Sequence, residues 1–362
     1  MRGALILAGG RGERFWPWSR PGRPKQLLPL ADGEILLEAT LGRLEGLVDP
    51  RHRIVLTARD LVEPVSRVVG ARARVVAEPV GRNTAPAVGL AALLARAAGA
   101  TGAMAVLPAD HRVAPLSAFQ ADLRSAFALA ERADDLVTFG IPPAWPETGY
   151  GYLERGDALG PARAFRVRAF REKPDAATAA VYVSDGAHLW NSGIFCWRPD
   201  VVLAALARHR PELAQGLDRI APAAEAWARG EERALDKSLD QHFGTLESIS
   251  IDYAVMEKAE NAVLLEASFE WDDVGSWRAW ARRQPRDARG NVTRGRALVL
   301  ESDNCIVLAG GAEPVIVLGG RDLIVVQEDA GTLVCPIERA DDVRRAATAA
   351  EELGASQAGK TR

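Results

Sequence analysis

Apolar and polar positions alternate in blocks along the first 141 residues, which predicts strands separated by helices. Short apolar runs that suit buried strands occur at residues 4–8, 53–57, 73–77, 103–107 and 136–141. Between them, apolar side chains recur at helical spacing at residues 36–48, 61–69, 85–98 and 119–133. This order predicts an α/β fold with a mainly parallel sheet flanked by helices.

The pattern changes after residue 140. Turn residues and short strands are expected at 148–152, 164–173 and 189–197, followed by helical segments at 201–239 and 249–258. A strand at 262–267 then leads into the acidic and aromatic segment 271–277. We expect this last segment to return to the edge of the sheet.

Five short β-branched segments between residues 297 and 337 are separated by Gly, Asn or Asp, and predict stacked β-structure. An amphipathic helix at 341–353 follows, and the tail after it is expected to be disordered. We place the domain boundary near residues 286–291. The predicted domains are therefore 1–286, built on the α/β sheet, and 287–362, a smaller β-rich domain with a closing helix.

The loop after the first strand is rich in glycine and cations. Gly9, Gly10 and Gly12 allow backbone N–H groups to approach a ligand, while Arg14 and Lys25 belong to a cluster of five cations that faces one acid. Such a loop favours binding of a polyanionic ligand. It lacks the Gly-Lys-Ser/Thr of a P-loop, and its prolines exclude the helix that a dinucleotide-binding fingerprint requires.

Ligands of parallel α/β sheets bind beyond the carboxyl ends of the strands. Three polar loops follow predicted strands, at residues 9–25, 78–86 and 108–111. We therefore expect these three loops to line one crevice.

Charge, cysteine and histidine content argue against several classes of protein. The formal net charge of −3 and the clustering of cations in one loop argue against nucleic-acid binding. The three cysteines frame neither a disulfide scaffold nor a thiolate site, and the five histidines show no close pairing for a zinc site or a catalytic triad. Neither a signal peptide nor a membrane-spanning run is recognisable, so the expectation is a cytoplasmic protein without membrane partners.

The segment GGRGERFWPWSRPGRPKQ resembles the signature loop of sugar nucleotidylyltransferases. Glu78-Pro79 to Ala85-Pro86 resembles the base-binding element of the mannose-1-phosphate guanylyltransferases within that family, in their short monofunctional form. The resemblance implies a Rossmann-like, GT-A-like nucleotidyltransferase domain, an inserted sugar-binding half after residue 140 and a β-helix-like C-terminal domain. The clustered histidines and glutamates of the isomerase half in longer relatives are absent, so no isomerase activity is expected.

The resemblance also implies roles for individual residues. Nucleotide contacts are expected from Ala8, Gly9, Gly10, Gly12, Arg14, Lys25, Glu78, Arg82, Asn83, Thr84, Pro108 and Asp110. Sugar-phosphate contacts are expected from Tyr150, Gly151, Glu172, Lys173 and Asn191. Mg²⁺ is the expected cofactor, with Asp110 and Asp273 as ligands and Asp272 as the alternative to Asp273. Arg14, Lys25, Asp110 and Lys173 are the expected catalytic residues.

Each residue also has a plain structural interpretation. Asp110 could cap a helix, Asp273 could belong to a turn, and Glu172 and Lys173 could form only a surface ion pair. Thr84 is expected to be an N-cap, with Pro86 in the first helical turn.

The implied reaction is GTP plus mannose 1-phosphate giving GDP-mannose and diphosphate, by direct attack of the sugar phosphate on the α-phosphorus. The nucleophile is already anionic, so no general base is required. Two alternatives stay open: another sugar phosphate (glucose or heptose) or another base, and a catalytically silent paralogue that binds sugar nucleotide and regulates a partner. The C-terminal β segments could supply a homodimer contact.

Overall fold

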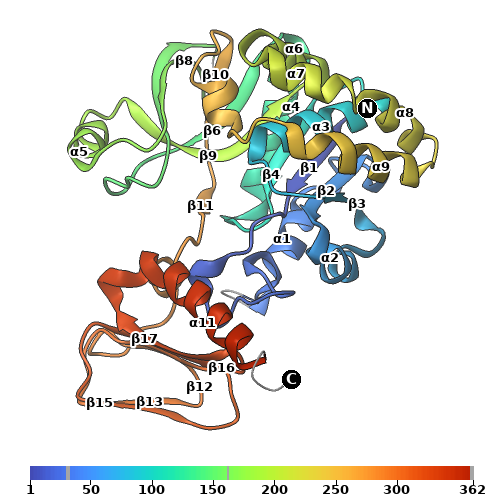
Figure 1. Ribbon diagram of the computed structural model, residues 1–362. Helices are drawn as coiled ribbons and strands as arrows, with labels where there is room; N and C mark the ends of the chain where they lie inside the picture. Colours follow the sequence, from blue (N-terminus) through green and yellow to red (C-terminus); the bar gives the residue numbers. More distant parts are fainter. Residues whose placement is uncertain (30–32, 161–162, 359–362) are drawn as a thin grey trace. The chain divides into compact units, whose positions relative to one another are not determined.

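The computed structural model describes residues 1–29, 33–160 and 163–358 (Figure 1). Contacts within the chain separate two compact units, and each unit combines segments that are distant in sequence. The first unit contains Met1–Gly9 and Glu38–Trp271, and the second contains Gly10–Leu37 and Asp272–Arg362. No helix among the described residues is long and apolar enough to cross a membrane.

The first unit is built on a nine-stranded sheet with the order β3-β2-β1-β4-β9-β6-β10-β8-β7. Its strands are β1 (Gly3–Leu7), β2 (Arg53–Ala58), β3 (Arg74–Glu78), β4 (Met104–Pro108), β6 (Leu136–Ile141), β7 (Tyr152–Ala158), β8 (Ala164–Arg171), β9 (His188–Trp197) and β10 (Ala262–Glu266). β1, β2, β3 and β4 pair in parallel, as do β6 and β10. β9 runs antiparallel between β4 and β6, and β8 is antiparallel to β10. The predicted mixed, mainly parallel sheet is confirmed.

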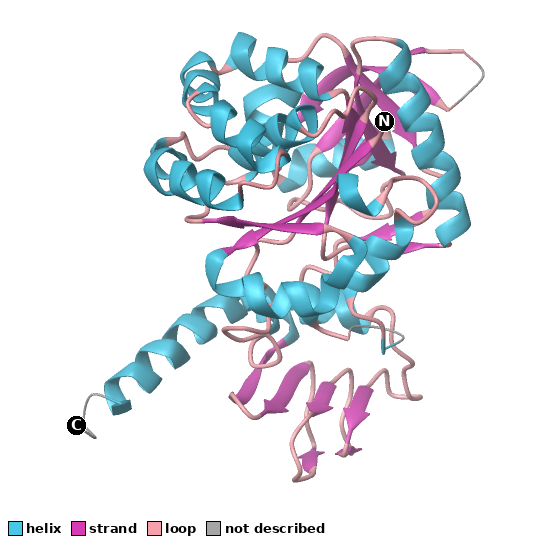
Figure 2. Cartoon of the chain, turned by 90° about the vertical axis from the view of Figure 1, so that its right-hand side faces the viewer, coloured by secondary structure: helices cyan, strands magenta, loops and turns pink. Residues whose placement is uncertain are grey.

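Helices lie on both faces of this sheet (Figure 2). They are α2 (Val62–Val69), α3 (Thr84–Ala97), α4 (Leu116–Arg132), α5 (Ala176–Ser184), α6 (Pro199–His209), α7 (Pro211–Asp218), α8 (Ala221–Ala228) and α9 (Glu232–His242). α1 (Leu36–Arg43) begins in the second unit and continues into the first. Two short strands, β5 (Arg112–Ala114) and β11 (Glu270–Asp272), form a separate pair.

α3 is buried along most of its length because it is rich in alanine and leucine on all sides. Small side chains allow close packing, and a Cβ added at Gly89 would lie 2.3 Å from Leu217 Cδ1 of α7. α3 therefore forms the centre of the helical layer that also contains α6, α7 and α8. Its N-terminus follows the loop after β3, so the burial of α3 fixes the position of that loop.

Most predicted elements of the first unit are present with ends shifted by a few residues. The segment 249–258 is an exception, since an α-helix was expected and the structure has a π-helical turn, Asp252–Met256. Its hydrogen bond from Glu257 N to Asp252 O (3.0 Å) spans five residues instead of four. Hydrophobic spacing does not distinguish these two helical forms over so short a stretch.

The second unit carries the C-terminal β-structure. β12 (Val292–Gly295), β14 (Ile306–Ala309), β16 (Leu323–Glu328) and β17 (Gly331–Pro336) form one sheet, and β13 (Ala297–Leu300) pairs with β15 (Val315–Leu318). Successive turns of chain stack in parallel, as Thr293, Val307 and Val325 do in register. The predicted β-helix-like stacking is confirmed, although β12 was not predicted.

Two helices complete this unit. α10 (Trp277–Ala281) begins at the N-cap Ser276, and α11 (Val343–Ala358) continues beyond the predicted end at residue 353. The tail at 359–362 lies outside the described residues.

An aromatic core joins the N-terminal loop to the C-terminal segments within the second unit. The ring of Trp277 lies 5.1 Å from Phe15 and stacks on Trp18 at 5.8 Å, measured between centroids. Val292 and Ile306 of the β-sheet belong to the same buried cluster. The glycine- and arginine-rich loop is therefore anchored by apolar side chains at its Trp and Phe positions, which leaves its polar positions for other contacts.

Candidate functional site

The ends of β1, β3 and β4 form one polar edge of the first unit. Ala8 N donates to Leu56 O (2.8 Å), and Ala109 N donates to Leu7 O (3.0 Å). The parallel register therefore aligns the residues that follow these strands, as Leu7 lies opposite both Leu56 and Pro108. The loops at 78–86 and 108–111, with Ala8 and Gly9, therefore begin at the same edge of the sheet, and that the three predicted loops line one crevice stays a prediction.

Glu78 is the most unusual residue at this edge. Its side chain is buried, with 9% of the residue exposed, and its Oε1 has no hydrogen-bond partner among the described residues. A Cβ added at Gly9 would lie 3.1 Å from Glu78 Oε2, so the carboxyl group faces the backbone at the end of β1. Burial raises the pKa of Glu78 to about 7. A buried acceptor without a donor lowers the free energy of unfolding, and such unsatisfied groups are typical of binding sites, where a ligand supplies the donor.

The loop that follows Glu78 is held from two sides. The Arg82 guanidinium donates to Gly244 O, and Asn83 has a φ of 64° with its Oδ1 accepting from Thr84 N (2.8 Å). Asn83 is thus the N-cap of α3, and the prediction that Thr84 is the N-cap was wrong. Thr84 lies one residue inside the helix, and its Oγ1 accepts from Ile251 N (2.8 Å) instead.

Asp110 follows β4 in a turn, not at a helix N-terminus. Its Oδ1 lies 3.8 Å from His111 Nε2, and about a third of its side chain is exposed. His111 Nδ1 accepts from Trp271 Nε1 (3.1 Å), which fixes the ring orientation. Among the described residues, no group of three or more His, Cys, Asp and Glu side chains is arranged to hold a metal ion.

The five predicted sugar-phosphate residues lie together in the first unit. A Cβ added at Gly151 would be 2.5 Å from Glu172 Oε2 and 3.4 Å from Asn191 Cβ. Lys173 N donates to Tyr150 O (3.2 Å), and Lys173 Nζ pairs with Glu172 Oε1 at 2.7 Å. Sequence distances of up to 41 positions between these residues are therefore closed by the pairing of β7, β8 and β9.

Charges in this cluster shift two pKa values. Burial lowers the pKa of Lys173, but the hydrogen bond and charge of Glu172 together with the charge of Asp252 outweigh burial, and the net shift is upward. Burial, followed by the charge of Glu172, raises the pKa of Asp252 to about 7. Asp252 was not predicted as a site residue. The available signal was an acid at the start of the otherwise apolar segment Tyr253 to Met256.

The signature loop belongs to the second unit. Gly12 has a φ of 64°, and a Cβ there would lie 2.3 Å from Lys25 Cβ, so the two halves of the loop touch at this glycine. Ser19 Oγ donates to Gly12 O (2.7 Å), and Gln26 Nε2 donates to Gly10 O (3.0 Å). The predicted absence of an α-helix is confirmed, since the loop contains only 3₁₀ turns at Glu13–Phe15 and Lys25–Leu27.

Lys25 connects this loop to the segment at 271–277. Its side chain is buried, and its Nζ donates to Asp273 O at 2.5 Å. Arg14 is exposed in the same loop. The neighbouring acids differ in their surroundings: buried Asp272 lies 3.6 Å and 3.7 Å from Arg282 and Arg283, whereas Asp273 Oδ1 accepts from Gly275 N at 3.1 Å. Asp272 is thus engaged by two arginines.

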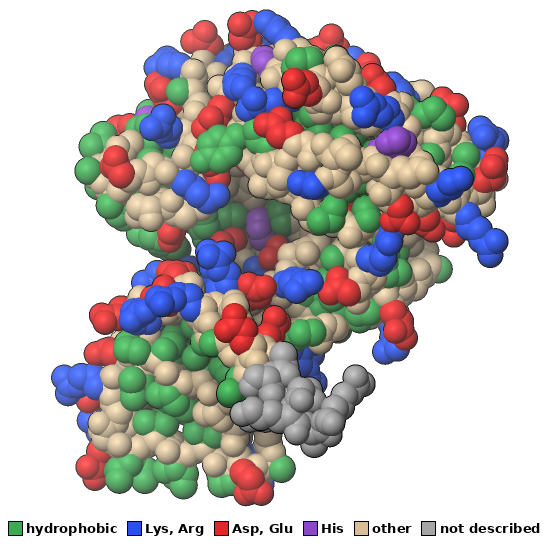
Figure 3. All heavy atoms as spheres, viewed as in Figure 1, with side chains coloured by type: hydrophobic (Ala, Val, Ile, Leu, Met, Phe, Trp, Pro, Cys, Tyr) green, Lys and Arg blue, Asp and Glu red, His purple; other side chains and the backbone are tan. Residues whose placement is uncertain are grey.

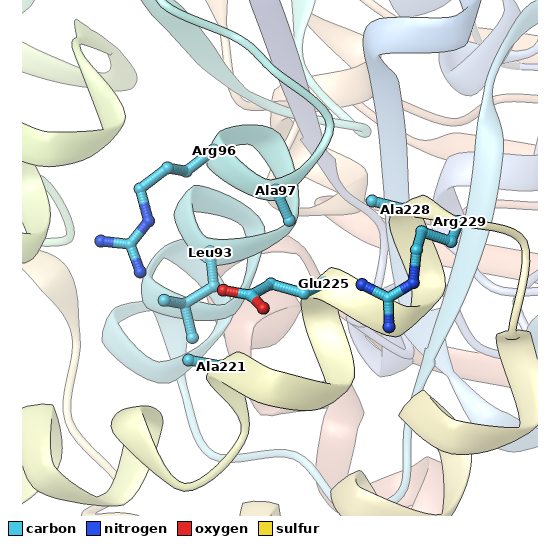
Figure 4. Close-up of a pocket in the computed structure, with 7 residues that line it drawn as sticks. All are labelled: Leu93, Arg96, Ala97, Ala221, Glu225, Ala228 and Arg229. Atoms are coloured by element: carbon cyan, nitrogen blue, oxygen red, sulfur yellow. The ribbon is translucent and has the colours of Figure 1, made fainter.

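A separate surface pocket of about 440 Å³ lies between α3 and α8 (Figure 4). Leu93, Arg96 and Ala97 line it from one helix, and Ala221, Glu225 and Ala228 from the other, with Arg229 at its end. None of the predicted site residues lines this pocket. The polar edge and the sugar-phosphate cluster therefore stay the candidate site.

Comparison with known proteins agrees with this organisation. Residues 3–289 match the family model described as "Nucleotidyl transferase", and residues 295–347 match "MannoseP isomerase/GMP-like beta-helix domain". The Xanthan biosynthesis protein XanB of Xanthomonas campestris pv. campestris is 37% identical over 98% of this chain and 74% of its own length. A Mannose-1-phosphate guanylyltransferase of Escherichia coli is 37% identical over 94% of this chain and 72% of its own length.

A solved structure matches nearly the whole chain. The crystal structure of "mannose-1-phosphate geranyltransferase" from Thermus thermophilus has a TM-score of 0.81 and 37% identity, and covers 97% of this chain and 99% of that one. The nucleotidyl transferase model spans well over half of the chain, and the relatives match over nearly all of it. The chain therefore belongs to the nucleotidyl transferase family, with a C-terminal β-helix domain of the MannoseP isomerase/GMP-like type.

Proposed function

We propose that this nucleotidyl transferase is a mannose-1-phosphate guanylyltransferase, which converts GTP and α-D-mannose 1-phosphate to GDP-mannose and diphosphate. The observation that carries the proposal is the buried Glu78 carboxyl group without a hydrogen-bond partner for its Oε1 among the described residues. Relatives named mannose-1-phosphate guanylyltransferase support the choice of substrates.

Guanine suits Glu78 better than the other bases do. The N1–H and the 2-amino group of guanine are two donors on one edge, and a carboxylate offers two acceptor oxygens. Uracil and thymine have one ring N–H between two carbonyl oxygens, and adenine has an acceptor nitrogen beside its amino group. Only guanine would therefore satisfy both oxygens of Glu78, while the loop at Arg82, Asn83 and Thr84 would line the rest of the nucleoside.

Catalysis would depend on positioning and charge. The sugar phosphate is an anionic nucleophile, so attack on the α-phosphorus requires no general base. Arg14 and Lys25 would neutralise the triphosphate and the leaving diphosphate, and Gly10 and Gly12 would allow the backbone to approach it. Lys173 would orient the attacking phosphate while Glu172 holds its ammonium group.

Asp110 and Asp273 are the residues that we assign to Mg²⁺. When bound, Mg²⁺ would supply positive charge to the phosphate oxygens. Magnesium keeps phosphate oxygens and water among its ligands, so two carboxylates suffice, and the partly exposed Asp110 fits this requirement. Asp272 fits it less well because two arginines already lie beside its carboxylate.

The first test is diphosphate release with Mg²⁺, crossing mannose 1-phosphate and glucose 1-phosphate with GTP, dTTP, UTP and ATP. Selective turnover of GTP with mannose 1-phosphate would support the proposal. Turnover of another pair would keep the reaction and replace the substrate. Binding of GDP-mannose without any turnover would instead identify a regulatory paralogue.

Two variants sharpen this test. Glu78→Gln should reduce kcat/KM for GTP about tenfold or more, since the amide replaces one acceptor by a donor, while leaving KM for mannose 1-phosphate unchanged. Asp110→Asn should remove most turnover at any Mg²⁺ concentration. Asp200→Asn, which alters an exposed acid of α6, serves as the control and should be fully active. Near-normal turnover by Asp110→Asn would disprove the metal assignment.

We further propose that two copies of the chain associate through the outer face of β13 and β15. Leu298, Leu300, Ile316 and Leu318 are all exposed there, and the register places Leu298 beside Ile316 and Leu300 beside Leu318. Figure 3 shows hydrophobic side chains gathered over this β-rich part of the chain. Exposed apolar patches of this kind are typical of interfaces.

Charges at the ends of the two strands favour a second copy as the occupant. Arg296 precedes β13 and Glu301 follows it, whereas Glu313 precedes β15 and Arg321 follows it. A two-fold axis that sets each strand antiparallel to its mate would pair Arg296 with Glu301 and Glu313 with Arg321 of the other copy. The patch is therefore self-complementary in both charge and hydrophobicity.

A further inference from the structure

The side chain of Asn191 is almost fully used inside the protein. Its Oδ1 lies 3.0 Å from the Thr138 hydroxyl and accepts from Gly193 N at 3.3 Å. Because Gly193 N can only donate, its hydrogen bond identifies this atom as the oxygen and fixes the orientation of the amide. One N–H of Nδ2 then donates to Asp252 Oδ1 at 2.9 Å. Asn191 therefore aims its amide at Asp252.

Asp252 is held by its backbone as well. It begins the π-helical turn Asp252–Met256, a form that is rare and occurs frequently at functional sites. Just before it, Ile251 N donates to Thr84 Oγ1 at 2.8 Å. Its carboxyl group is thus placed by Asn191 on one side and by a defined backbone turn on the other.

The surroundings of Asp252 are those of the sugar-phosphate cluster. The charges of Glu172 and Lys173 both act on its carboxyl group, and Asp252 is only partly buried. Asn191 takes up one of the two carboxyl oxygens. The second oxygen receives no hydrogen bond from another of the described residues, and a carboxyl oxygen so placed can accept from a hydroxyl group.

We propose that Asp252 binds a hydroxyl group of the sugar in the sugar 1-phosphate substrate, and that Asn191 acts mainly as its positioning residue. This inference rests on the proposed function only for the identity of the sugar. It adds a specificity residue that no part of the signature loop or the Glu172–Lys173 motif supplies. A neutral or ionised carboxyl group serves equally, because either form keeps an oxygen that accepts.

The test measures binding of mannose 1-phosphate by calorimetry, which needs no turnover. Asp252→Asn should raise its Kd about tenfold or more and leave the Kd of GTP unchanged, because an NH₂ group that donates replaces the oxygen that accepts from the sugar. Asp135→Asn is the control, since Asp135 is an acid of the first unit that is buried and paired with Arg166 at 2.6 Å, outside this cluster. It should bind mannose 1-phosphate as the unmodified protein does.

The series of monodeoxy mannose 1-phosphates separates a direct contact from a structural effect. If Asp252 binds one hydroxyl, the unmodified protein and Asp252→Asn should bind the sugar lacking that hydroxyl equally, and differ about tenfold for the others. A loss of the same size for every sugar, or no loss at all, would overturn the proposal. Thr138→Val, which removes a contact of Asn191 Oδ1, should weaken binding of the same sugars by a smaller factor.

The outcome is separable from that of the proposed function. A protein that binds mannose 1-phosphate through Asp252 but releases no diphosphate with any nucleotide would disprove the guanylyltransferase assignment and keep this inference. Turnover that is unaffected by Asp252→Asn at low mannose 1-phosphate would disprove this inference and keep the guanylyltransferase assignment.

Discussion

Glu78 has a charge state that depends on pH in the physiological range. Its pKa of about 7 in the folded protein lies above the value of 4.5 expected for an unfolded chain. The folded protein therefore holds a proton more tightly than the unfolded one. The resulting contribution to stability is complete below pH 4.5 and is lost as the pH rises through 7.

Replacing Glu78 by Gln removes this pH dependence. At pH 8, Glu78→Gln should be more stable than the unmodified protein by up to about 3 kcal/mol, the equivalent of the pKa difference. At pH 4 the two proteins should be close in stability. Urea unfolding at several pH values between 4 and 8 measures the difference in stability between the two proteins. A difference that stays constant over this range would contradict the raised pKa of Glu78.

At Gly12, the close approach of Lys25 leaves no room for a side chain. Gly12→Ala would force a Cβ to within 2.3 Å of Lys25 Cβ and would also strain a backbone with φ 64°. Displacement of Lys25 should lower kcat about 100-fold. Gly22→Ala is the matched control because Gly22 lies in the same loop at φ 76° with no atom within 4 Å of its added Cβ. An equal loss of kcat in the two variants would show that backbone strain, and not displacement of Lys25, causes the loss.

The sequence predicted five sugar-phosphate residues but did not predict Asp252 beside them. Glu172 and Lys173 stand in a recognisable motif, and they form the ion pair that their plain structural interpretation allows. Asp252 becomes notable only through Asn191, which lies 61 positions earlier in the chain. A hydrogen bond between distant segments leaves no pattern in a single sequence, so the geometry was needed to find it.

At the scale of elements, the N-terminus of α3 is joined to the segment before the π-helical turn. Ala85 N donates to Ile249 O (3.0 Å), and Ile251 N donates to Thr84 Oγ1 (2.8 Å). The element proposed to hold the nucleoside is thus bonded directly to the segment that positions Asp252. Binding of base and sugar should therefore be coupled.

Thr84→Val tests this connection. The valine keeps the shape of threonine but leaves Ile251 N without its acceptor, which should destabilise the protein by about 1–2 kcal/mol. We expect KM to rise several-fold for both GTP and mannose 1-phosphate. Thr84→Ser retains the hydroxyl group and should restore both values. If only stability changed, the bond would be structural and the coupling would be absent.

The order of elements was predictable because buried strands and amphipathic helices differ in hydrophobic period. The position of β9 was not. Its apolar pattern predicts a buried strand, but the same pattern fits a parallel or an antiparallel strand between any two neighbours. The antiparallel insertion of β9 between β4 and β6 depends on pairing between distant segments. The domain boundary near residues 286–291 remains a prediction.

At the scale of the whole molecule, the face of β13 and β15 predicts a dimer. Leu318→Asp would place a charge in the apolar centre of the proposed contact and should shift the protein towards monomer in sedimentation experiments. Val334→Asp is the control, since Val334 is about as exposed but belongs to β17. A monomeric unmodified protein at micromolar concentration would refute the interface.

Charge exchange gives an independent check of the two-fold arrangement. In the proposed dimer Arg296 would face Glu301 of the other copy, so Arg296→Glu should weaken association, and the double variant Arg296→Glu with Glu301→Arg should restore it. Failure of the double variant to recover would mean that the two strands do not meet antiparallel.

The composition of the second unit has a consequence for the order of events during synthesis. Phe15 and Trp18 emerge from the ribosome early, but their partners Trp277 and Trp280 are made more than 250 residues later. The sheet of the first unit can begin to form while the signature loop still lacks its apolar support. The nascent chain therefore carries an exposed aromatic loop until its last quarter is translated, and chaperone dependence should end only after that point.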